Sequence, residues 1–378
     1  MQVLQFGGGN FLRAFLGPAL QALSTATGTD VRAVVVKPTE RGDYAALRQQ
    51  NGRYHVAVRG MLDGERVDRL EFIDVVDRVV HPYREWAAFL ASATAPELCV
   101  VVSNTTEAGI RFVPEDYRAD VCPAEFPAKL CRWLQARFEG AGAVPTYILP
   151  CELIEANGNR LREAVLAYAD HWQLSGAFVS YVTEYCYFAN TLVDRIVSGK
   201  PPADSELYAR LPFPDQLLAV AEPYHLWAIA ASPELRRAFP LDDSAFNAVF
   251  TDDLDKYRTL KVRILNGLHI LMVLTGLPAG VETVGAYVAD PTRAAWLERV
   301  LHEEIIPSLP YPEATCKAYA AEVMDRFRNP FLHHRLADIA LNKTEKVQVR
   351  LLPTVEAYRA RFGRAPSLLG EVLDKVKH

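Results

Sequence analysis

The amino-acid sequence predicts an α/β protein in which an N-terminal doubly wound parallel sheet is followed by a mostly α-helical C-terminal domain. Three observations support this fold class. Short apolar runs alternate with helical patterns over the first half of the chain, a glycine-rich turn follows the first run, and long helical patterns fill the second half. Alternation of strands and helices is typical of a parallel sheet that helices cover on both faces.

The apolar runs of the first half are continuous rather than alternating, as is typical of parallel strands buried on both faces. An extra hairpin, formed by residues 55–59 and 66–76, is expected after the second strand. Helices are expected at residues 12–23 and 160–171, and strands at residues 3–6, 33–36, 98–102, 146–149 and 177–182.

Beyond about residue 186 the pattern changes to long helical stretches without a comparable strand. The sequence therefore predicts two domains, residues 1–186 and residues 187–378, a division that also fits the length of 378 residues. The helical stretches of the second domain are residues 215–239, 253–275, 293–306, 313–327 and 355–362.

Composition and charge exclude several classes of protein. Half of the residues are hydrophobic, so the chain can bury a sizeable core and is not of the disordered class. The 41 Lys and Arg residues are scattered, and against 46 Asp and Glu they leave a formal charge of −5, so nucleic acid is not an expected partner. The apolar stretch at residues 264–277 is shorter than the about 20 residues of a membrane span, so no membrane segment is expected.

The cysteines and the N-terminus predict a cytoplasmic protein. The six cysteines lie far apart without a C-x-x-C pair, which argues against a structural zinc site and a disulfide framework and predicts reduced thiols. The first predicted strand begins at once after Met1, which leaves no room for a charged leader and an apolar signal region.

The turn between the first predicted strand and the first helix carries a G-x-G element, Gly7 and Gly9. Glycines at these positions allow a tight turn and let backbone amides approach a pyrophosphate at the N-terminus of the helix. This context indicates a Rossmann-type dinucleotide-binding domain, with Asn10, Phe11 and Arg13 following in the first helical turn. Leu12 replaces the usual third glycine, and a glycine turn of purely structural value is the alternative.

Two further strand ends are candidates for cofactor binding. The second strand is followed by Lys37 rather than by the acidic residue that usually binds the adenosine ribose, so NADP use stays open beside NAD, and a solvated lysine is the alternative. Asn104 and Thr105 follow the strand at residues 98–102, at the carboxyl edge where ligands bind in such sheets.

Lys261, Asn266 and His269 interrupt an apolar helical stretch. At about 100° per residue, Asn266 lies roughly 140° from Lys261 and His269 roughly 80° from it, so all three share one side of a helix. A lysine in a cleft can exchange a proton with an alcohol oxygen, an amide can bind an oxygen on which negative charge develops, and a histidine can orient a substrate. Snorkelling or satisfied core side chains are the alternative.

Asn157 follows the strand at residues 146–149 and precedes Gly158, so it could complete the site for a developing negative charge. A turn or helix-cap asparagine is the alternative at this position.

Five motifs, in order along the chain, resemble the polyol-specific long-chain dehydrogenases, the family that includes the mannitol dehydrogenases. They comprise residues 6–14, Ser-Asn-Thr-Thr-Glu-Ala-Gly at 103–109, Pro-Cys-Glu with Asn-Gly within 150–158, Asn-Thr-Leu-Val-Asp-Arg-Ile at 190–196, and the lysine, asparagine and histidine at 261, 266 and 269. Residues 103–109, 150–155 and the Arg-Asn-Pro-Phe run at 328–331 are most similar to family members that reduce tagaturonate.

The resemblance implies NAD(H)-dependent hydride transfer, without a metal, between a keto-hexonate such as tagaturonate and its alcohol altronate. Lys261 would be the acid/base, Asn157 and Asn266 would form an oxyanion hole, and His269 would bind and orient the sugar. A mannitol, polyol or polyol-phosphate dehydrogenase or a fructuronate reductase is the alternative within the family. A non-catalytic dinucleotide-binding sensor is a remote alternative from another class.

The resemblance also implies roles for four further residues. Val193 and Asp194 would lie beside the nicotinamide, and Lys346 would be the late lysine that binds the substrate. Arg335 is the nearest candidate for the family's substrate-binding arginine.

Overall fold

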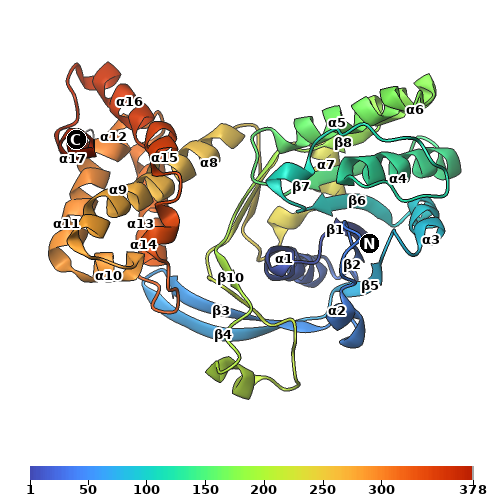
Figure 1. The fold of residues 1–378 in the computed structure, drawn as a ribbon, viewed down its shortest axis with the longest axis horizontal. Coiled ribbons are helices and arrows are strands. Elements are labelled where there is room, and N and C mark those ends of the chain that lie inside the picture. Colours follow the sequence, from blue (N-terminus) through green and yellow to red (C-terminus); the bar gives the residue numbers. More distant parts are fainter. Residues whose placement is uncertain (377–378) are drawn as a thin grey trace. The chain divides into compact units, whose positions relative to one another are not determined.

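The structure, a computed structural model, describes residues 1–376, apart from the side chains of residues 107 and 376 (Figure 1). Its residues form two compact units, each with its own internal contacts. Unit 1 consists of Met1–Ala57, Leu70–Ala221 and His225–Leu254. Unit 2 consists of Val58–Arg69, Glu222–Tyr224 and the described residues from Asp255 onward.

A six-stranded parallel sheet with the order β5-β2-β1-β6-β7-β8 forms the centre of unit 1, which confirms the predicted doubly wound architecture. Helices α4 (Phe126–Ala141), α5 (Asn157–His171) and α6 (Gly176–Glu184) lie on one side of this sheet, and α1 (Asn10–Thr27) lies on the other (Figure 1). The strands are β1 (Gln2–Phe6), β2 (Arg32–Val36), β5 (Val76–Val80), β6 (Leu98–Ser103), β7 (Thr146–Pro150) and β8 (Cys186–Phe188).

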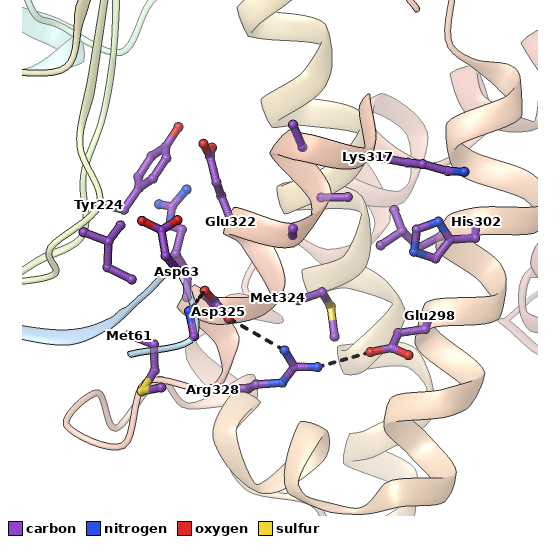
Figure 2. Close-up of a pocket in the computed structure, with 17 residues that line it drawn as sticks. Met61, Asp63, Tyr224, Glu298, His302, Lys317, Glu322, Met324, Asp325 and Arg328 are labelled. Carbon is purple, nitrogen blue, oxygen red and sulfur yellow. Dashed lines mark hydrogen bonds and ion pairs between the residues drawn. The ribbon is translucent and has the colours of Figure 1, made fainter. Parts of the chain in front are cut away.

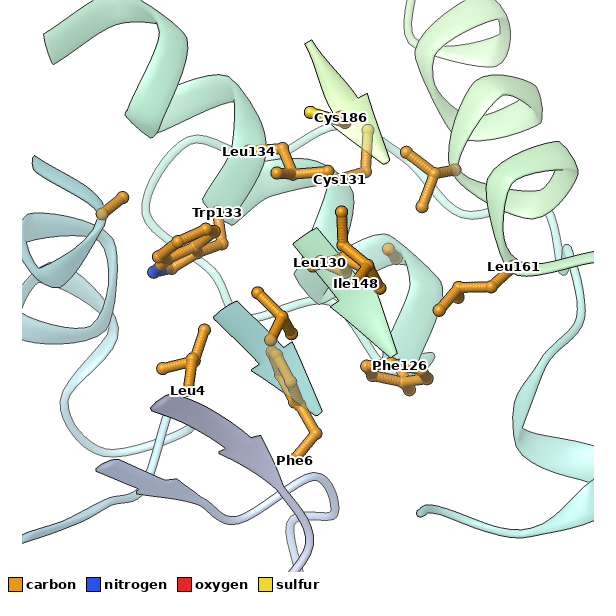
Figure 3. Close-up of a cluster of buried hydrophobic side chains, with 14 of the residues drawn as sticks. Leu4, Phe6, Phe126, Leu130, Cys131, Trp133, Leu134, Ile148, Leu161 and Cys186 are labelled. Atoms are coloured by element: carbon orange, nitrogen blue, oxygen red, sulfur yellow. The ribbon is translucent and has the colours of Figure 1, made fainter. Parts of the chain in front are cut away.

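The strands are continuous apolar runs because both faces of the sheet are covered. On the face toward α4, side chains of β1 and β7 pack with those of the helix in one buried cluster (Figure 3). The rings of Phe6 and Phe126 lie 4.9 Å apart between their centroids. Leu4, Trp133, Ile148 and Leu161 are fully buried in the same cluster.

Residues 177–182 were expected to form a strand, and this prediction is wrong because they lie in helix α6. Phe178, Tyr181 and Val182 are the buried residues of this segment, and their spacing of three and four makes one helical stripe. Ser175 caps the helix by accepting a hydrogen bond from the backbone amide of Phe178. The sixth strand, β8, comes immediately afterwards and is only three residues long.

The segment between β8 and residue 254 was expected to be helical and instead contains five short strands. The predicted helix at residues 215–239 is wrong, since Pro223 lies between two strands and only Pro233–Ala238 (α7) is α-helical there. Two smaller sheets result, β13-β12-β9 and β10-β11-β3-β4, and the second includes the predicted hairpin, β3 (Tyr54–Leu62) and β4 (Glu65–Ile73). The five strands are β9 (Thr191–Asp194), β10 (Val197–Gly199), β11 (Ala219–Ala221), β12 (Leu226–Ala230) and β13 (Ala248–Thr251).

Unit 2 is mostly helical, as predicted, and its central helix is buried on all sides from Gly267 to Val273. The longer helical segment that contains it, Leu254–Ala279, is long and apolar enough to cross a membrane. Length and composition are the only grounds for this, and the core helices of soluble proteins meet the same criteria. The helices are α8 (Leu254–Leu260), a π-helix (Lys261–Asn266), α9 (Gly267–Gly276), α10 (Val284–Ala289), α11 (Pro291–Val300), a second π-helix (Leu301–Ile305), α12 (Ile306–Ser308), α13 (Glu313–Phe327), α14 (Leu336–Ile339), α15 (Lys343–Arg350), α16 (Leu352–Phe362) and α17 (Ser367–Val376).

The last helix of unit 2 is anchored by the buried carboxylate of Glu304, which lies in the second π-helix. Glu304 accepts hydrogen bonds of 2.8 Å from the backbone amides of both Leu368 and Leu369, and one of 3.2 Å from the hydroxyl of Ser367. These amides belong to the first turn of α17 and have no acceptor within the helix. A negative charge is also favoured at this end of a helix.

We predict that Glu304→Ala loosens α17, because it leaves two helix-end amides without an acceptor, at a cost of about 2 kcal/mol. Hydrogen exchange measured by mass spectrometry should show faster exchange in the peptide that covers residues 367–375. The neighbouring Glu303→Ala is the control, since it removes only an exposed ion pair with Arg299. Equal exchange in α17 of both variants would contradict the anchoring role.

Candidate active site

The glycine turn after β1 brings two loops of unit 1 into contact. Gly7 has a φ of 111°, and a Cβ added there would lie 2.9 Å from the backbone oxygen of Asn104. Only glycine fits this position without strain. Gly9 caps the N-terminus of α1 with an ordinary φ of −71° and no side-chain cap, and a Cβ added to it would meet no atom within 4 Å. The turn therefore leaves open space beside the helix N-terminus at Gly9.

Arg13 and Tyr44 hold the turn in place. The guanidinium of Arg13 donates hydrogen bonds to the Gly8 carbonyl at 2.6 Å and to the Asn10 side-chain oxygen at 2.7 Å. The hydroxyl of Tyr44 accepts a hydrogen bond of 2.8 Å from the Gly8 backbone amide. Asn10 is exposed, and Phe11 stacks on Phe15 with their ring centroids 5.0 Å apart.

A buried carboxylate, Glu152, holds the loop after β6. It accepts hydrogen bonds from the backbone amide and hydroxyl of Thr105, at 2.8 Å and 3.0 Å, and from the Ser103 hydroxyl at 3.0 Å. Asn104 in the same loop donates its side-chain amide to the Cys151 carbonyl at 2.9 Å. Burial raises the pKa of Glu152, while the hydrogen bonds from Thr105 and Ser103 oppose the rise.

The Lys37 side chain is buried against its own turn at the end of β2. Its ammonium donates hydrogen bonds to the carbonyl and the hydroxyl of Thr39 and lies 5.3 Å from the centre of the Tyr44 ring. Burial lowers the pKa of Lys37, and Asp43 opposes the shift. The positive charge at this strand end is therefore already hydrogen-bonded within the turn.

Asn157 is buried at the start of α5, and its side-chain amide is fully engaged with the backbone. Its nitrogen lies 3.0 to 3.1 Å from the carbonyl oxygens of Pro150, Glu152 and Thr191. Its oxygen accepts hydrogen bonds of 2.9 Å from the backbone amides of Gly158 and Thr191. Asn157 thus joins the end of β7, the start of α5 and strand β9.

Val193 and Asp194 are buried in β9, within unit 1. They pair with Trp227 and Leu226 of the antiparallel strand β12. The loop with Asn104 and Thr105, the glycine turn and β9 therefore all belong to unit 1.

In unit 2, Lys261 and Asn266 are the first and last residues of the π-helix. A π-helix forms hydrogen bonds between residues five apart, so these two residues lie one turn apart rather than at the roughly 140° of an α-helix. His269 follows in α9 after about one α-helical turn. The three side chains therefore start from one face of the helix at successive turns, which is closer than the spacing expected from an α-helical pattern.

The three side chains have different surroundings. His269 is buried, and the centroid of its ring lies 4.8 Å from those of Phe327 and of His334. Burial lowers the pKa of His334, and Arg326 adds to this effect while Asp338 opposes it. Lys261 and Asn266 are partly exposed, and no described side chain or backbone group hydrogen-bonds to the side-chain amide of Asn266.

The two predicted substrate cations also lie in unit 2. The Lys346 ammonium donates a hydrogen bond of 2.8 Å to the Ile339 carbonyl, and burial lowers its pKa. Arg335 is exposed and precedes α14, where its backbone forms a bridge with Thr283. The structure therefore places Lys346 against the helical core and leaves the Arg335 side chain in solvent.

The mannitol dehydrogenase Rossmann domain family matches residues 1–241, and the mannitol dehydrogenase C-terminal domain family matches residues 253–372. The chain belongs to the mannitol dehydrogenase family. This family consists of dehydrogenases that act on CH–OH groups with a nicotinamide cofactor, and the predicted family, fold class and enzyme class are confirmed.

Curated relatives are similar over nearly the whole chain. An altronate oxidoreductase from Halalkalibacterium halodurans is 41% identical over 97% of this chain and 73% of its own length. One from Yersinia enterocolitica is 40% identical over 97% of this chain and 77% of its own length.

Two solved structures share the fold. A substrate-free D-sorbitol dehydrogenase aligns with a TM-score of 0.82 at 22% identity, covering 98% of this chain and 78% of its own. The Pseudomonas fluorescens mannitol 2-dehydrogenase, in a ternary complex with NAD and D-mannitol, aligns with a TM-score of 0.73 at 21% identity, covering 99% and 77%.

A cavity of about 690 Å³ lies elsewhere in unit 2 of this mannitol dehydrogenase family member, between the β3–β4 hairpin tip, α11 and α13 (Figure 2). In its wall Arg328 pairs with Glu298 at 3.2 Å and with Asp325 at 3.7 Å. None of the predicted site residues lines it. Among the side chains that the structure describes, no group of three His, Cys, Asp or Glu residues is arranged to hold a metal ion.

Sequence reasoning did not single out three residues that contact or neighbour predicted site residues in the structure: Glu152 beside Thr105, Tyr44 beside the glycine turn, and Arg350 beside Lys346. Glu152 is part of the Pro-Cys-Glu run that carried the resemblance, so its carboxylate was visible although its partners were not. Tyr44 accepts its hydrogen bond from the amide of Gly8, which lies 36 residues away in the sequence, and nothing local in the sequence indicates that contact. Arg350 follows Lys346 by one helical turn, a spacing that could have drawn attention to it.

We predict that Gly7→Ala destabilises this dehydrogenase and that Gly9→Ser does not. Gly7→Ala should lower the free energy of unfolding by about 2 kcal/mol, because it forces a left-handed backbone and a clash with Asn104. Gly9→Ser should leave stability within about 0.5 kcal/mol, because serine is a good cap with an ordinary φ. Urea denaturation measures both, and similar losses in the two variants would contradict the geometry of the turn.

Proposed function

We propose that this chain catalyses the reversible NAD(H)-dependent reduction of a keto-hexonate, tagaturonate, to altronate. The observation that carries the proposal is the placement of Lys261, Asn266 and His269 at successive turns of one helix face. The names of the relatives at 40–41% identity support the choice of substrate.

Unit 1 is proposed to bind the nicotinamide cofactor. The open space at Gly9 and the uncapped N-terminus of α1 suit a pyrophosphate, whose charge is favoured at that end of a helix. Asn10, Phe11 and Arg13 would flank it, Asn104 and Thr105 would lie along the adjoining strand end, and Val193 and Asp194 would lie beside the nicotinamide. NAD is favoured over NADP because the Lys37 charge is already bound within its turn, rather than available for a ribose phosphate.

Unit 2 is proposed to supply the proton. The bound cofactor supplies a hydride to the keto carbon. As negative charge develops on the keto oxygen, Lys261 transfers a proton from its ammonium to that oxygen, and an alcohol results. Solvent then reprotonates the lysine. In the reverse direction the neutral lysine accepts the alcohol proton.

Asn266, Asn157 and His269 are proposed to bind the substrate around the reacting oxygen. The Asn266 amide is suited to donate a hydrogen bond to the developing negative charge, since it has no other partner within residues 1–376. The corresponding contribution of Asn157 requires one of its amide hydrogens to leave a backbone carbonyl. His269 orients a sugar hydroxyl, and Lys346 or Arg335 balances the substrate carboxylate.

The enzyme is proposed to act in the cytoplasm, where its small-molecule substrate and cofactor are dissolved. All six cysteines are free thiols, and five of them are buried, which suits a reducing compartment.

Substrate choice is tested by following NADH and NADPH oxidation with tagaturonate, fructuronate, fructose and fructose 6-phosphate. We expect the highest kcat/KM with tagaturonate and NADH. A preference for fructose would favour a polyol dehydrogenase, and a preference for fructose 6-phosphate would favour a polyol-phosphate dehydrogenase. Absence of turnover with all four compounds would contradict the proposed function and each of its alternatives within the family.

We predict that Lys261→Met lowers kcat by about 10²- to 10⁴-fold, because it removes the proton donor while keeping the length of the side chain. The Kd of NADH, measured by fluorescence titration, should not change. Lys317→Met is the matched control, since that exposed lysine on α13 only pairs with Glu313. Near-normal turnover by Lys261→Met would rule out the acid/base role.

A further inference from the structure

Helix α15 carries two cations one turn apart, Lys346 and Arg350. Residues four apart lie side by side on a helix, and two like charges in this arrangement repel each other. Burial and the charge of Arg350 lower the pKa of Lys346, whereas the carboxylate of Glu345 raises it. The helix therefore keeps an unfavourable pair of positive charges that one neighbouring acid does not balance.

Arg350 has no anionic partner within the described residues. The side chain is partly buried, and no carboxylate lies within ion-pair distance of it anywhere in residues 1–376 whose side chains are described. Burial lowers the pKa of Arg350, and no nearby acid opposes the shift. A partly buried guanidinium without a counter-ion is costly, because its charge has lost part of its water.

The position of α15 relates this charge to the proposed reaction. Within unit 2, α15 packs against the π-helix and against α9, the two elements that carry Lys261, Asn266 and His269. The backbone of Gly267, the residue after Asn266, lies close to the end of α15, and a Cβ on it would be 3.7 Å from the Arg350 carbonyl. The cation pair thus lies on a helix that is in direct contact with the helix of the proposed acid/base.

The other arginines near these elements are engaged or exposed. Arg263 lies within the π-helix itself, and it donates hydrogen bonds to the hydroxyls of Thr354 at 2.5 Å and Ser308 at 3.3 Å. Arg335 is exposed to solvent. Of Arg263, Arg335 and Arg350, it is Arg350 that is partly buried and has no hydrogen bond or ion pair among the described side chains.

We propose that Arg350, together with Lys346, binds the carboxylate of the sugar-acid substrate and so selects sugar acids over neutral ketoses. This inference rests on the proposed function and assigns its carboxylate site. An arginine can bind both oxygens of a carboxylate at once, and a bound anion would relieve the repulsion between the two cations. In this inference the arginine that acts with Lys346 is Arg350, while Arg335 stays the other candidate named under the proposed function.

The test compares tagaturonate with tagatose, which carries a neutral CH₂OH group where tagaturonate carries the carboxylate. Arg350→Gln should lower kcat/KM for tagaturonate by about 10- to 100-fold, the range of a lost hydrogen bond to a charged group, and should leave kcat/KM for tagatose unchanged. Arg350→Lys should recover part of the loss, because it restores the charge without the paired geometry. Arg359→Gln, an exposed arginine on the neighbouring helix α16, is the matched control and should behave like the unaltered enzyme.

The selectivity ratio separates a carboxylate site from a structural role. A variant that is merely misfolded loses activity on both substrates, and an unchanged ratio of the two kcat/KM values would overturn the proposal. A loss in Arg350→Gln confined to tagaturonate and absent from Arg359→Gln would support it.

A binding measurement distinguishes this inference from the proposed function. Calorimetric titration with altronate reports the carboxylate site without turnover. If the unaltered enzyme binds altronate but reduces no keto-hexonate, the proposed function fails, while a 10-fold or larger rise in Kd in Arg350→Gln still supports the site. If turnover of tagaturonate is normal and both kcat/KM and Kd are unchanged in Arg350→Gln, only the inference fails.

Discussion

The carboxyl edge of the parallel sheet depends on two polar side chains that are buried and satisfied by the backbone. Glu152 joins the loop after β6 to the end of β7, and Asn157 joins the end of β7 to α5 and β9. Parallel strands end at this edge with loops that cannot hydrogen-bond to one another as strands do, so side chains must supply the missing partners. The glycine turn then fits against this fixed edge, because Gly7 allows the Asn104 carbonyl to approach closely.

In unit 2 the corresponding constraint is the π-helix. An extra residue in one turn brings Lys261 and Asn266 into line with His269, whereas in a regular α-helix the three would span roughly 140° of one side. The wider turn is stabilised by its surroundings, since the following helix is buried from Gly267 to Val273. The second π-helix has a structural use of the same kind, because it contains the carboxylate that anchors α17.

Elements with a long or doubly buried pattern could be predicted from the sequence. Strands β1, β2, β6 and β7 were found because burial on both faces leaves a continuous apolar run, and the glycine turn was found because it lies between two such elements. Strand β8 and the strands between residues 187 and 254 were missed because all but β12 are only three or four residues long, too short to show a period. The segment at 177–182 misled because its β-branched and aromatic residues form a helical stripe.

Prediction of the site was limited by contacts between residues that are distant in the sequence. Residue types with an obvious chemistry, such as Lys261 and His269, could be recognised within one helix. Contacts between distant segments could not, and these decide that Asn157 is fully hydrogen-bonded while Asn266 is not. The regular 100° period also hid the π-helix, because hydrophobic spacing records which residues are buried rather than how many residues make one turn.

The hydroxyl of Tyr44 bears on how the proposed site would bind and release its cofactor. It accepts the hydrogen bond of the Gly8 amide, so this backbone donor is not left without a partner. In the proposed cofactor site, a phosphate oxygen that accepted a hydrogen bond from this amide would displace the hydroxyl, so binding would exchange one hydrogen bond for another instead of adding one. When such a phosphate left, the hydroxyl could accept the hydrogen bond of the amide again. The exchange would reduce the free energy gained on cofactor binding and would favour release of the cofactor.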